Sequence, residues 1–416
     1  MLHFTASAWT YDGDGTMTGA QSNGPPLARY VIAATLARTS DGGAVVAIVL
    51  LVNTSGGPGW LAGLLAASIT APHLLGPFVA RRLDTAEDGR TVIAWSAVIH
   101  ALTLAGAVLL FPFTPALVPA VLLIASGLVG PMLTGGISSR LPRIAGPELA
   151  QQRRAQGWDV ATYGIGGTVG PSVVAAISAW ASPTVAALTL AAGALMAAAF
   201  IRLLPYQPRE FAATDVPRPA RTLALMLRSA RLRRTLYLTV VVALSVAVLP
   251  ITAVNSASML NVDAASAALL TAAYGLGSLT GSFGVMVRPL RGSADRLMTR
   301  LAALIVVALA AVMLAPSFPI AAITYVVAGT LNSYFFAATL AARSEYSPRS
   351  ARAQVFVWVG ALKITAGSAG TALAGALVGI DPVLPLVAGA VVTAAAVLVS
   401  AAERRIDPGV GEAAQS

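Results

Sequence analysis

The chain has 416 residues, of which 56% are hydrophobic and only 11% are charged, and its formal net charge at pH 7 is +10. This composition is too apolar for a soluble domain of the same length, so it excludes that class of protein. The absence of cysteine excludes disulfides, thiolate metal sites and cysteine catalysis.

Apolar segments make up most of the chain. The polar residues 1–28 do not resemble a signal peptide, and we expect a disordered tail with Met17 as a second candidate start. Twelve apolar segments follow, each long enough to cross the hydrocarbon core of a bilayer, which is about 30 Å thick. We therefore predict an all-α membrane protein, in which a linker at 205–234 separates six helices in 29–204 from six in 235–402, and 403–416 form a second tail. The expected segments are 29–52, 58–80, 91–111, 116–138, 155–180, 184–204, 235–255, 264–287, 298–315, 319–341, 353–379 and 382–402.

The basic residues lie at alternate gaps between these segments. Except for Arg38 and Lys363, the 27 Lys and Arg lie before the first segment, at every second gap or after the last segment. The other gaps hold only Asp263 and Asp381 as charged residues. Because basic residues near membrane ends stay on the cytoplasmic side, we expect both termini to be cytoplasmic. Arginine outnumbers lysine 26 to 1 in this alanine-rich chain, a usage that resembles high-GC bacteria and favours the plasma membrane.

The linker at 205–234 carries arginines among leucines. Arg221, Arg228 and Arg231 recur at near-helical spacing, which predicts either a short helix on the anionic inner leaflet or a solvated basic linker. The two sides of the linker are weakly similar, since residues 154–156 and 352–354 both read Arg-Ala-Gln. Internal repeats of this kind place a transporter's substrate site between the halves.

With these features the chain resembles the major facilitator superfamily. The stretch GPFVARRLD at 76–84 is similar to its loop motif G-x-x-x-D-R-x-G-R: Gly76 and Arg81 match, Ala80 replaces the acid, and Asp84 comes four residues later. The helix at 155–180 resembles the motif of drug–proton antiporters, G-x8-G-x3-G-P-x-x-G-G. Its matching residues are Gly157, Gly166, Gly170 and Pro171. The resemblance implies a fold of two six-helix halves, proton antiport, and an inner gate formed by Gly76, Arg81 and Asp84.

Two pairs of glycines have the spacing of close helix contacts. Gly166 and Gly170 in the fifth helix are four residues apart, as are Gly277 and Gly281 in the eighth. Because the fifth and eighth helices meet across the halves in the resembled fold, we expect these glycines at the interface between the halves. The alternative is ordinary tight packing within each half.

Three ionisable side chains lie deep in apolar segments, where such groups usually face a cavity or a partner. Asp41 lies about 18 Å and Arg38 about 13 Å from Arg29 along the first helix, and their spacing of three places them on one face. Asp41 is the candidate proton and substrate carboxylate, with Arg38 tuning its pKa; the alternative is a permanent ion pair. Lys363, the only lysine, lies about 15 Å into the eleventh helix, where we expect it to pair with Asp41 or with the substrate, or else to be a packing anchor.

Polar and aromatic residues could complete a substrate cavity. Asn332 and Tyr334 suit hydrogen bonding and stacking, although bonding between helices would equally explain Asn332. Other candidates for the cavity are Tyr163, Tyr274 and His73. We expect His73 and His100 to be neutral and satisfied by neighbours. Asp159, about 6 Å into the fifth helix, is expected to be an interfacial, solvated or locally paired acid.

Several functions are excluded by missing motifs. The sequence has no phosphate-binding loop, no catalytic triad pattern and no credible metal site among its three histidines. We therefore expect no enzymatic activity, no metal and no cofactor, with a proton gradient as the energy source. The alternating gaps explain the net charge, so nucleic acid is not an expected partner.

The preferred interpretation is a monomeric secondary transporter in a lipid bilayer, which exports a small drug or metabolite in exchange for protons. One alternative is uptake of a small nutrient, by proton symport or facilitated diffusion. Another is a non-transporting receptor or scaffold, which would not need deep charges such as Asp41 and Lys363.

Overall fold

The computed structural model describes residues 9–11, 17–19, 24–209 and 211–406, and it confirms the predicted helical membrane fold. Twelve helical spans in these residues are long and apolar enough to cross a membrane. The first six comprise α1 (Gly24–Thr54), α2–η1–α3 (Gly59–Thr70, Ala71–Leu75, Gly76–Thr85), α4 (Gly89–Leu110), α5–η2–α6 (Leu117–Pro131, Met132–Gly136, Leu141–Ala145), α7 (Leu149–Trp180) and α8 (Pro183–Arg202). The other six comprise α10–α11 (Ala230–Val246, Leu249–Asn255), α12 (Ala264–Val287), α13 (Ala294–Met313), α14 (Phe318–Tyr346), η4–α15 (Arg349–Ala351, Arg352–Val378) and α16 (Leu384–Ile406).

Prolines interrupt three of the spans. Pro72 lies in the 3₁₀ segment η1 between α2 and α3, and Pro131 precedes the π-helical turn η2 after α5. Pro250 follows the break between α10 and α11. Proline lacks an amide donor and clashes with the preceding turn, so the helical hydrogen-bond ladder changes at each position. One of these breaks, at η1, places His73 inside the bundle.

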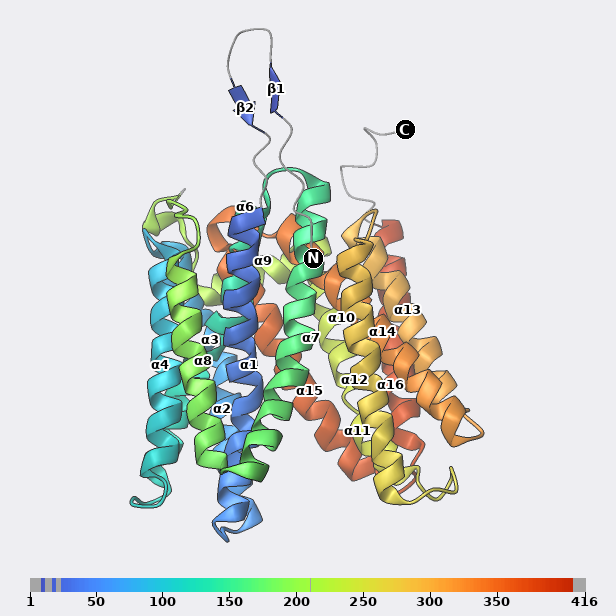
Figure 1. Ribbon diagram of the computed structural model, residues 1–416. Helices are drawn as coiled ribbons and strands as arrows, with labels where there is room; N and C mark the ends of the chain where they lie inside the picture. Colours follow the sequence, from blue (N-terminus) through green and yellow to red (C-terminus); the bar gives the residue numbers. More distant parts are fainter. Residues whose placement is uncertain (1–8, 12–16, 20–23, 210, 407–416) are drawn as a thin grey trace.

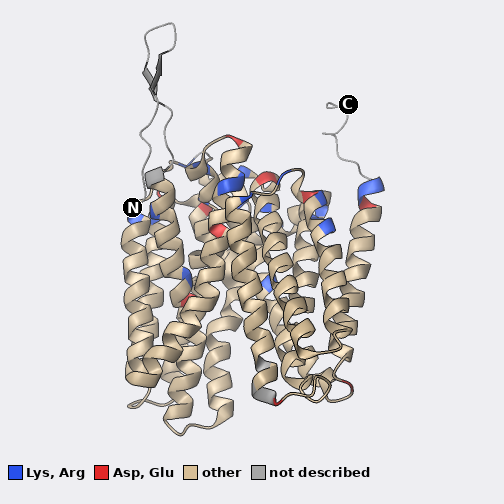
Figure 2. Ribbon diagram, turned by 45° about the vertical axis from the view of Figure 1, so that its right-hand side comes forward, with Lys and Arg blue, Asp and Glu red and all other residues tan. Residues whose placement is uncertain are grey.

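The charged residues gather at one end of the bundle, which we call the basic end (Figure 2). It is the end at which α1 begins and α16 ends (Figure 1). Asp88, between the second and third spans, forms ion pairs there with Arg90 (2.9 Å) and Arg202 (3.1 Å). Its hydrogen bond to Arg90 lowers the pKa of Asp88 to about 2, so this carboxylate stays charged at physiological pH.

The spans form two bundles of six, one coloured blue to green and the other yellow to red (Figure 1). Each bundle has apolar cores of its own, such as the cluster around Leu104 and Leu123 in the first and that around Leu238 and Leu309 in the second. The halves meet where α7 packs against α12 and where α15 packs against α3, η1 and η2. At the other end of the molecule, α2 and α11 pack chiefly against elements of their own halves.

The linker contains one short helix, α9 (Pro219–Arg228), after the 3₁₀ turn η3 (Ala213–Asp215). One side of α9 packs on α15, because Thr222 donates to Gln354 Oε1 (3.0 Å) and Met226 is buried against Trp358. Arg221 on its other side is exposed. The short helix that was one of the two predicted alternatives is therefore present as α9. It packs against α15 of the second half.

Part of the N-terminal tail has regular structure. β1 (Trp9–Tyr11) pairs antiparallel with β2 (Met17–Gly19), with Thr10 opposite Thr18. Aromatic and β-branched residues favour strands, which explains this difference from the predicted disorder. The rest of residues 1–23 lies outside the described part of the chain.

Candidate functional site

Arg38 forms a buried ion pair with Asp159. Its Nη1 donates to Asp159 Oδ1 (2.7 Å), and the exposed fractions of the two side chains are 2% and 1%. Asp159 Oδ1 also accepts from the Tyr30 hydroxyl (2.6 Å), and Oδ2 accepts from Ser138 Oγ (2.9 Å). The carboxylate thus joins α1, α7 and the end of the fourth span. Three donors therefore hold the carboxylate of Asp159 in place, and two of these hydrogen bonds and the ion pair are made by residues outside α7.

The predicted pairing of Arg38 with Asp41 is wrong, as is the interfacial position of Asp159. The helix α7 begins at Leu149, six residues before the expected start. Asp159 therefore lies about 15 Å from the helix start, deep enough to meet Arg38. Arg38 Nη1 also donates to Thr162 Oγ1, and its guanidinium carbon lies 3.5 Å from the centroid of the Tyr163 ring.

The partner of Asp41 is His73. Asp41 Oδ1 lies 3.8 Å from His73 Nε2, and His73 Nδ1 lies 2.9 Å from the carbonyl oxygen of Ile69. A carbonyl only accepts, so Nδ1 carries a hydrogen and Nε2 is the ring nitrogen that gains or loses a proton. Asp41 and His73 can therefore hold one proton between them. A Cβ atom at Gly130 would lie 2.7 Å from His73 Nε2 and 3.0 Å from Asp41 Oδ1, so glycine makes room for this pair.

His100 lies in α4 and is fully buried. Its Nε2 lies 3.1 Å from Ser40 Oγ and its Nδ1 lies 2.8 Å from Ser126 Oγ. Both ring nitrogens have hydroxyl partners, as the expectation of a histidine satisfied by neighbours requires.

Lys363 packs on an aromatic ring. Its Nζ lies 3.9 Å from the centroid of Phe336 in α14, and the predicted pairing with Asp41 is not formed. Arg343 also lies beside Phe336, with its guanidinium carbon 5.9 Å from the same centroid. The rings of Phe336 and Tyr163 form an edge-to-face pair with 4.8 Å between centroids, so this aromatic pair joins the two halves.

Sequence reasoning missed Arg343 and Phe336. Arg343 was expected in the gap after residue 341, but α14 continues to Tyr346 and leaves Arg343 only 1% exposed. Phe336 belongs to the aromatic cluster that follows Asn332 and Tyr334, but its contacts with Arg343 and Lys363 depend on the packing of α14 and α15. A longer tenth helix would have been needed to find Arg343.

The remaining cavity candidates pack within the second half. The hydroxyl of Tyr274 in α12 lies beside the polar side chains of Ser278 and of Asn332 in α14. Tyr334 fits against Gly284, where a Cβ atom would lie 2.5 Å from its hydroxyl oxygen. These contacts favour bonding between helices, and a substrate role for Asn332, Tyr334 and Tyr274 stays a prediction.

The two glycine pairs do not lie at the interface between the halves. Gly166 and Gly170 pack against α1, at Arg38 and Thr39, within the first half. Gly277 and Gly281 pack against α14 within the second. Pro171 lies beside Gly170 inside α7. The expected contact of α7 with α12 does exist, but Gly157 makes it, against the backbone of Met286.

The predicted gate residues lie where the halves meet at the basic end. Asp84 Oδ1 accepts from the backbone amide of Ala353 (2.9 Å), and Oδ2 accepts from that of Gln354 (3.0 Å). The N-cap of α15 is Ala351, which has no side-chain acceptor, so Asp84 of the other half caps this helix. Gly76 lies against Val357 of α15, whereas Arg81 donates to the linker carbonyl of Val216 (3.4 Å).

A second contact crosses the halves near this cap. Arg153 Nη2 of α7 forms an ion pair with Glu345 Oε1 of α14 (2.7 Å) and donates to the carbonyl oxygen of Gly292 (3.0 Å). Polar contacts therefore join the two halves at the basic end in this conformation.

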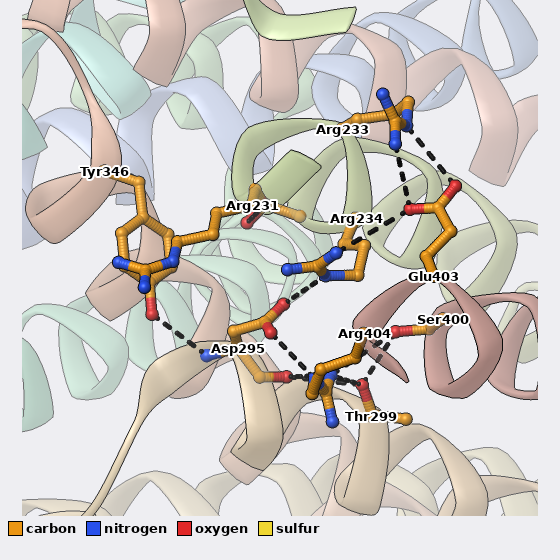
Figure 3. Close-up of polar contacts among 10 residues, drawn as sticks. Arg231, Arg233, Arg234, Asp295, Thr299, Tyr346, Ser400, Glu403 and Arg404 are labelled. Atoms are coloured by element: carbon orange, nitrogen blue, oxygen red, sulfur yellow. Dashed lines mark hydrogen bonds and ion pairs between the residues drawn. The ribbon is translucent and has the colours of Figure 1, made fainter. Parts of the chain in front are cut away.

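Other charges of the basic end are neutralised within the second half (Figure 3). Asp295 accepts from Arg234 Nε (2.8 Å) and from Arg404 Nε (2.9 Å), which ties together α10, α13 and α16. Glu403 lies 3.3 Å from Arg233 Nη2. This network stabilises the bundle, because each of the three arginines has a carboxylate within 4 Å.

Comparisons with known proteins agree with this architecture. No family model matches the sequence. An uncharacterized MFS-type transporter, y4rN, of Sinorhizobium fredii is 32% identical over 187 residues. That match covers 42% of this chain, and the chain spans 43% of the length of that relative.

Solved structures match over nearly the whole chain. The human organic anion transporter MFSD10 has a TM-score of 0.71 at 14% identity, covering 90% of this chain and 100% of the other. The transporter FucP in its outward conformation also has a TM-score of 0.71, at 14% identity over 92% and 99% of the two chains. The proton:xylose symporter XylE has 0.68 at 13% identity over 90% and 95%. The chain therefore has the fold of the major facilitator superfamily, and the resemblance seen in its sequence is confirmed.

Proposed function

We propose that the chain is a secondary transporter that moves a small organic molecule across a bilayer by alternating access and exports it in exchange for protons. The observation that carries this proposal is the pair of Asp41 and His73, which can hold one proton within an apolar bundle. An ionisable pair at such a depth has a large energetic cost and is typical of proton pathways. A receptor or scaffold would not need it.

The contacts at the basic end support alternating access. Asp84 and the ion pair of Arg153 with Glu345 join the halves by hydrogen bonds and charge, which water can replace when the halves separate. We place the basic end in the cytoplasm of a bacterial cell, since basic residues stay on that side of a plasma membrane. The substrate would then enter from the cytoplasm when these contacts break.

The sequence motif and the solved structures bear on the direction of transport. The partial antiporter motif at Gly157, Gly166, Gly170 and Pro171 favours export. Uptake remains the second candidate, because XylE is a proton:xylose symporter and FucP is a fucose:proton symporter. Flux measured in inverted and in right-side-out vesicles separates the two directions.

Access to the centre can be tested without knowing the substrate, because the chain has no cysteine. A Cβ atom at Gly360 would meet no atom within 4 Å, so a single cysteine there would be reachable. We expect a membrane-impermeant maleimide to label Gly360→Cys from both sides of the membrane. Two further cysteines can be placed at Arg153 and Glu345 and joined by a short cross-linker. This cross-link should abolish labelling of Gly360→Cys from the basic end. Labelling from one side alone under all conditions would refute alternating access.

Proton coupling is tested by Asp41→Asn, which removes the titrating group with little change in size. We expect this variant to fold normally but to lose proton-coupled flux in proteoliposomes, followed by a lumenal pH dye while candidate organic compounds are added. Glu87→Gln, at an exposed carboxylate, is the matched control. Full proton-coupled flux in Asp41→Asn would remove this residue from the mechanism.

A further inference from the structure

Two cations of the second half that lie against Phe336 have no carboxylate partner among the described residues. Arg343 and Lys363 both lie against the ring of Phe336, at 5.9 and 3.9 Å from its centroid. Arg343 makes one hydrogen bond, from Nη1 to the carbonyl oxygen of Phe356 (3.4 Å), and its Nε and Nη2 are buried without a partner. Asp159 interacts electrostatically with Arg343 but is paired with Arg38, so the cations outnumber the acids here.

The other buried arginines of the described chain show that this is an exception. Arg38 pairs with Asp159, Arg153 with Glu345 and Arg234 with Asp295, all at 2.7 to 2.8 Å. Arg343, at 1% exposure, is buried at least as deeply as these three. Each of the other three buried arginines thus has a carboxylate partner, whereas Arg343 has none among the described residues.

The free atoms of Arg343 have a definite geometry. Nε and Nη2 are the two donors along one edge of the guanidinium group, and this edge matches the two oxygens of a carboxylate. Lys363 adds a point charge 3.9 Å from the centroid of the same ring. The arrangement suits one carboxylate together with an apolar or aromatic body, for which Phe336 and Tyr163 offer ring surfaces.

Lys363 borders open space in this conformation. Gly360 and Gly367 lie on the same face of α15 at helical spacing from Lys363, and a Cβ atom at either glycine would meet no atom within 4 Å. The free edge of Arg343, by contrast, is enclosed while the basic end is closed. Arg343 lies three residues from the end of α14, so separation of the halves at the basic end would uncover it.

On the basis of the proposed transport function, we propose that the substrate is a small organic anion whose carboxylate is bound by Arg343 and Lys363. Arg343 binds it in the state open at the basic end, and Lys363 holds it in the state described here. The anion completes the charge balance at the point where Tyr163 and Phe336 join the halves. Substrate binding and closure are thereby linked through one charge.

Binding by purified full-length protein tests this assignment independently of transport. The probes are benzoate and phenylacetate, with benzamide and phenylacetamide as uncharged analogues and benzyltrimethylammonium as a cation of similar size. We expect the carboxylates to raise the midpoint of thermal unfolding at concentrations at which the amides and the cation do not, because a ligand that prefers the folded state stabilises it. Lys363→Gln should weaken carboxylate binding at least tenfold, and Lys363→Arg should restore most of it.

Controls separate binding from folding. Arg405→Gln removes an exposed charge at the end of α16 and should leave carboxylate binding unchanged. Arg343→Gln should also weaken carboxylate binding. If this variant fails to fold, the comparison of the parent chain with Lys363→Gln and Lys363→Arg decides the question. The proposal is overturned if no carboxylate stabilises the protein, if amides or the cation do so equally, or if Lys363→Gln binds carboxylates as well as the parent chain. If carboxylates bind but Gly360→Cys is labelled from one side only, the proposed transport fails while the anion site stands.

Discussion

Removing the charge of Asp159 should destabilise the protein strongly while preserving most hydrogen bonds of the site. In the parent chain Arg38 Nη1 and the Tyr30 hydroxyl lie 2.7 and 2.6 Å from Asp159 Oδ1. In Asp159→Asn the side-chain oxygen can still accept from both donors. The new amide nitrogen would face the hydroxyl of Ser138, which can turn to accept. The substitution therefore removes chiefly the charge.

The expected magnitude follows from the burial of the partner. The side chain of Arg38 is 2% exposed and would keep its charge without a counter-ion. Breaking a buried pair in this way costs about 3–5 kcal/mol. Replacing both members, as in Arg38→Met with Asp159→Leu, should recover part of this loss, because an apolar pair leaves no buried charge. The Tyr30 and Ser138 hydroxyls would then lose a partner, at about 1 kcal/mol each.

Denaturant unfolding of the purified protein in mixed micelles measures these differences. Glu87→Gln, at an exposed acid, should stay within about 0.5 kcal/mol of the parent chain. The reasoning is refuted if Asp159→Asn is as stable as Glu87→Gln. It is also refuted if the double replacement loses as much stability as the two single replacements together, because the pair would then have no coupling energy.

Two further substitutions test the proton pair and the gate. Gly130→Ala would place a methyl group 2.7 Å from His73 Nε2, so we expect it to displace the pair with Asp41 and to abolish proton-coupled flux while costing about 1–3 kcal/mol of stability. Gly63→Ala, where a Cβ atom meets nothing within 4 Å, should leave flux unchanged, and normal flux in Gly130→Ala would contradict the assignment. Asp84→Ala removes the cap of α15, at about 0.5–2 kcal/mol. The conformation closed at the basic end should then be less populated, so maleimide should label Gly360→Cys faster from that side. An unchanged labelling rate would show that the cap of α15 does not stabilise the closed conformation.

The sequence was sufficient for properties that depend on one stretch of chain at a time. The number of spans follows from hydrophobic length, since each segment must cross the apolar core by itself. The loop motif drew attention to Asp84, but the sequence did not predict that this residue caps α15. The internal breaks at Pro72, Pro131 and Pro250 have an equally local cause.

Only the tertiary structure decided which side chains meet. Arg38 and Asp41 share one face of α1, yet Arg38 pairs with Asp159 and Asp41 with His73. The glycines of α7 could pack on either of two neighbouring helices, and the fold placed Gly166 and Gly170 against α1. Arg343 became a buried cation because α14 extends beyond its apolar segment. Such contacts depend on the rotation and axial position of each helix relative to its neighbours, and packing between helices sets both. Hydropathy along a single helix contains neither quantity.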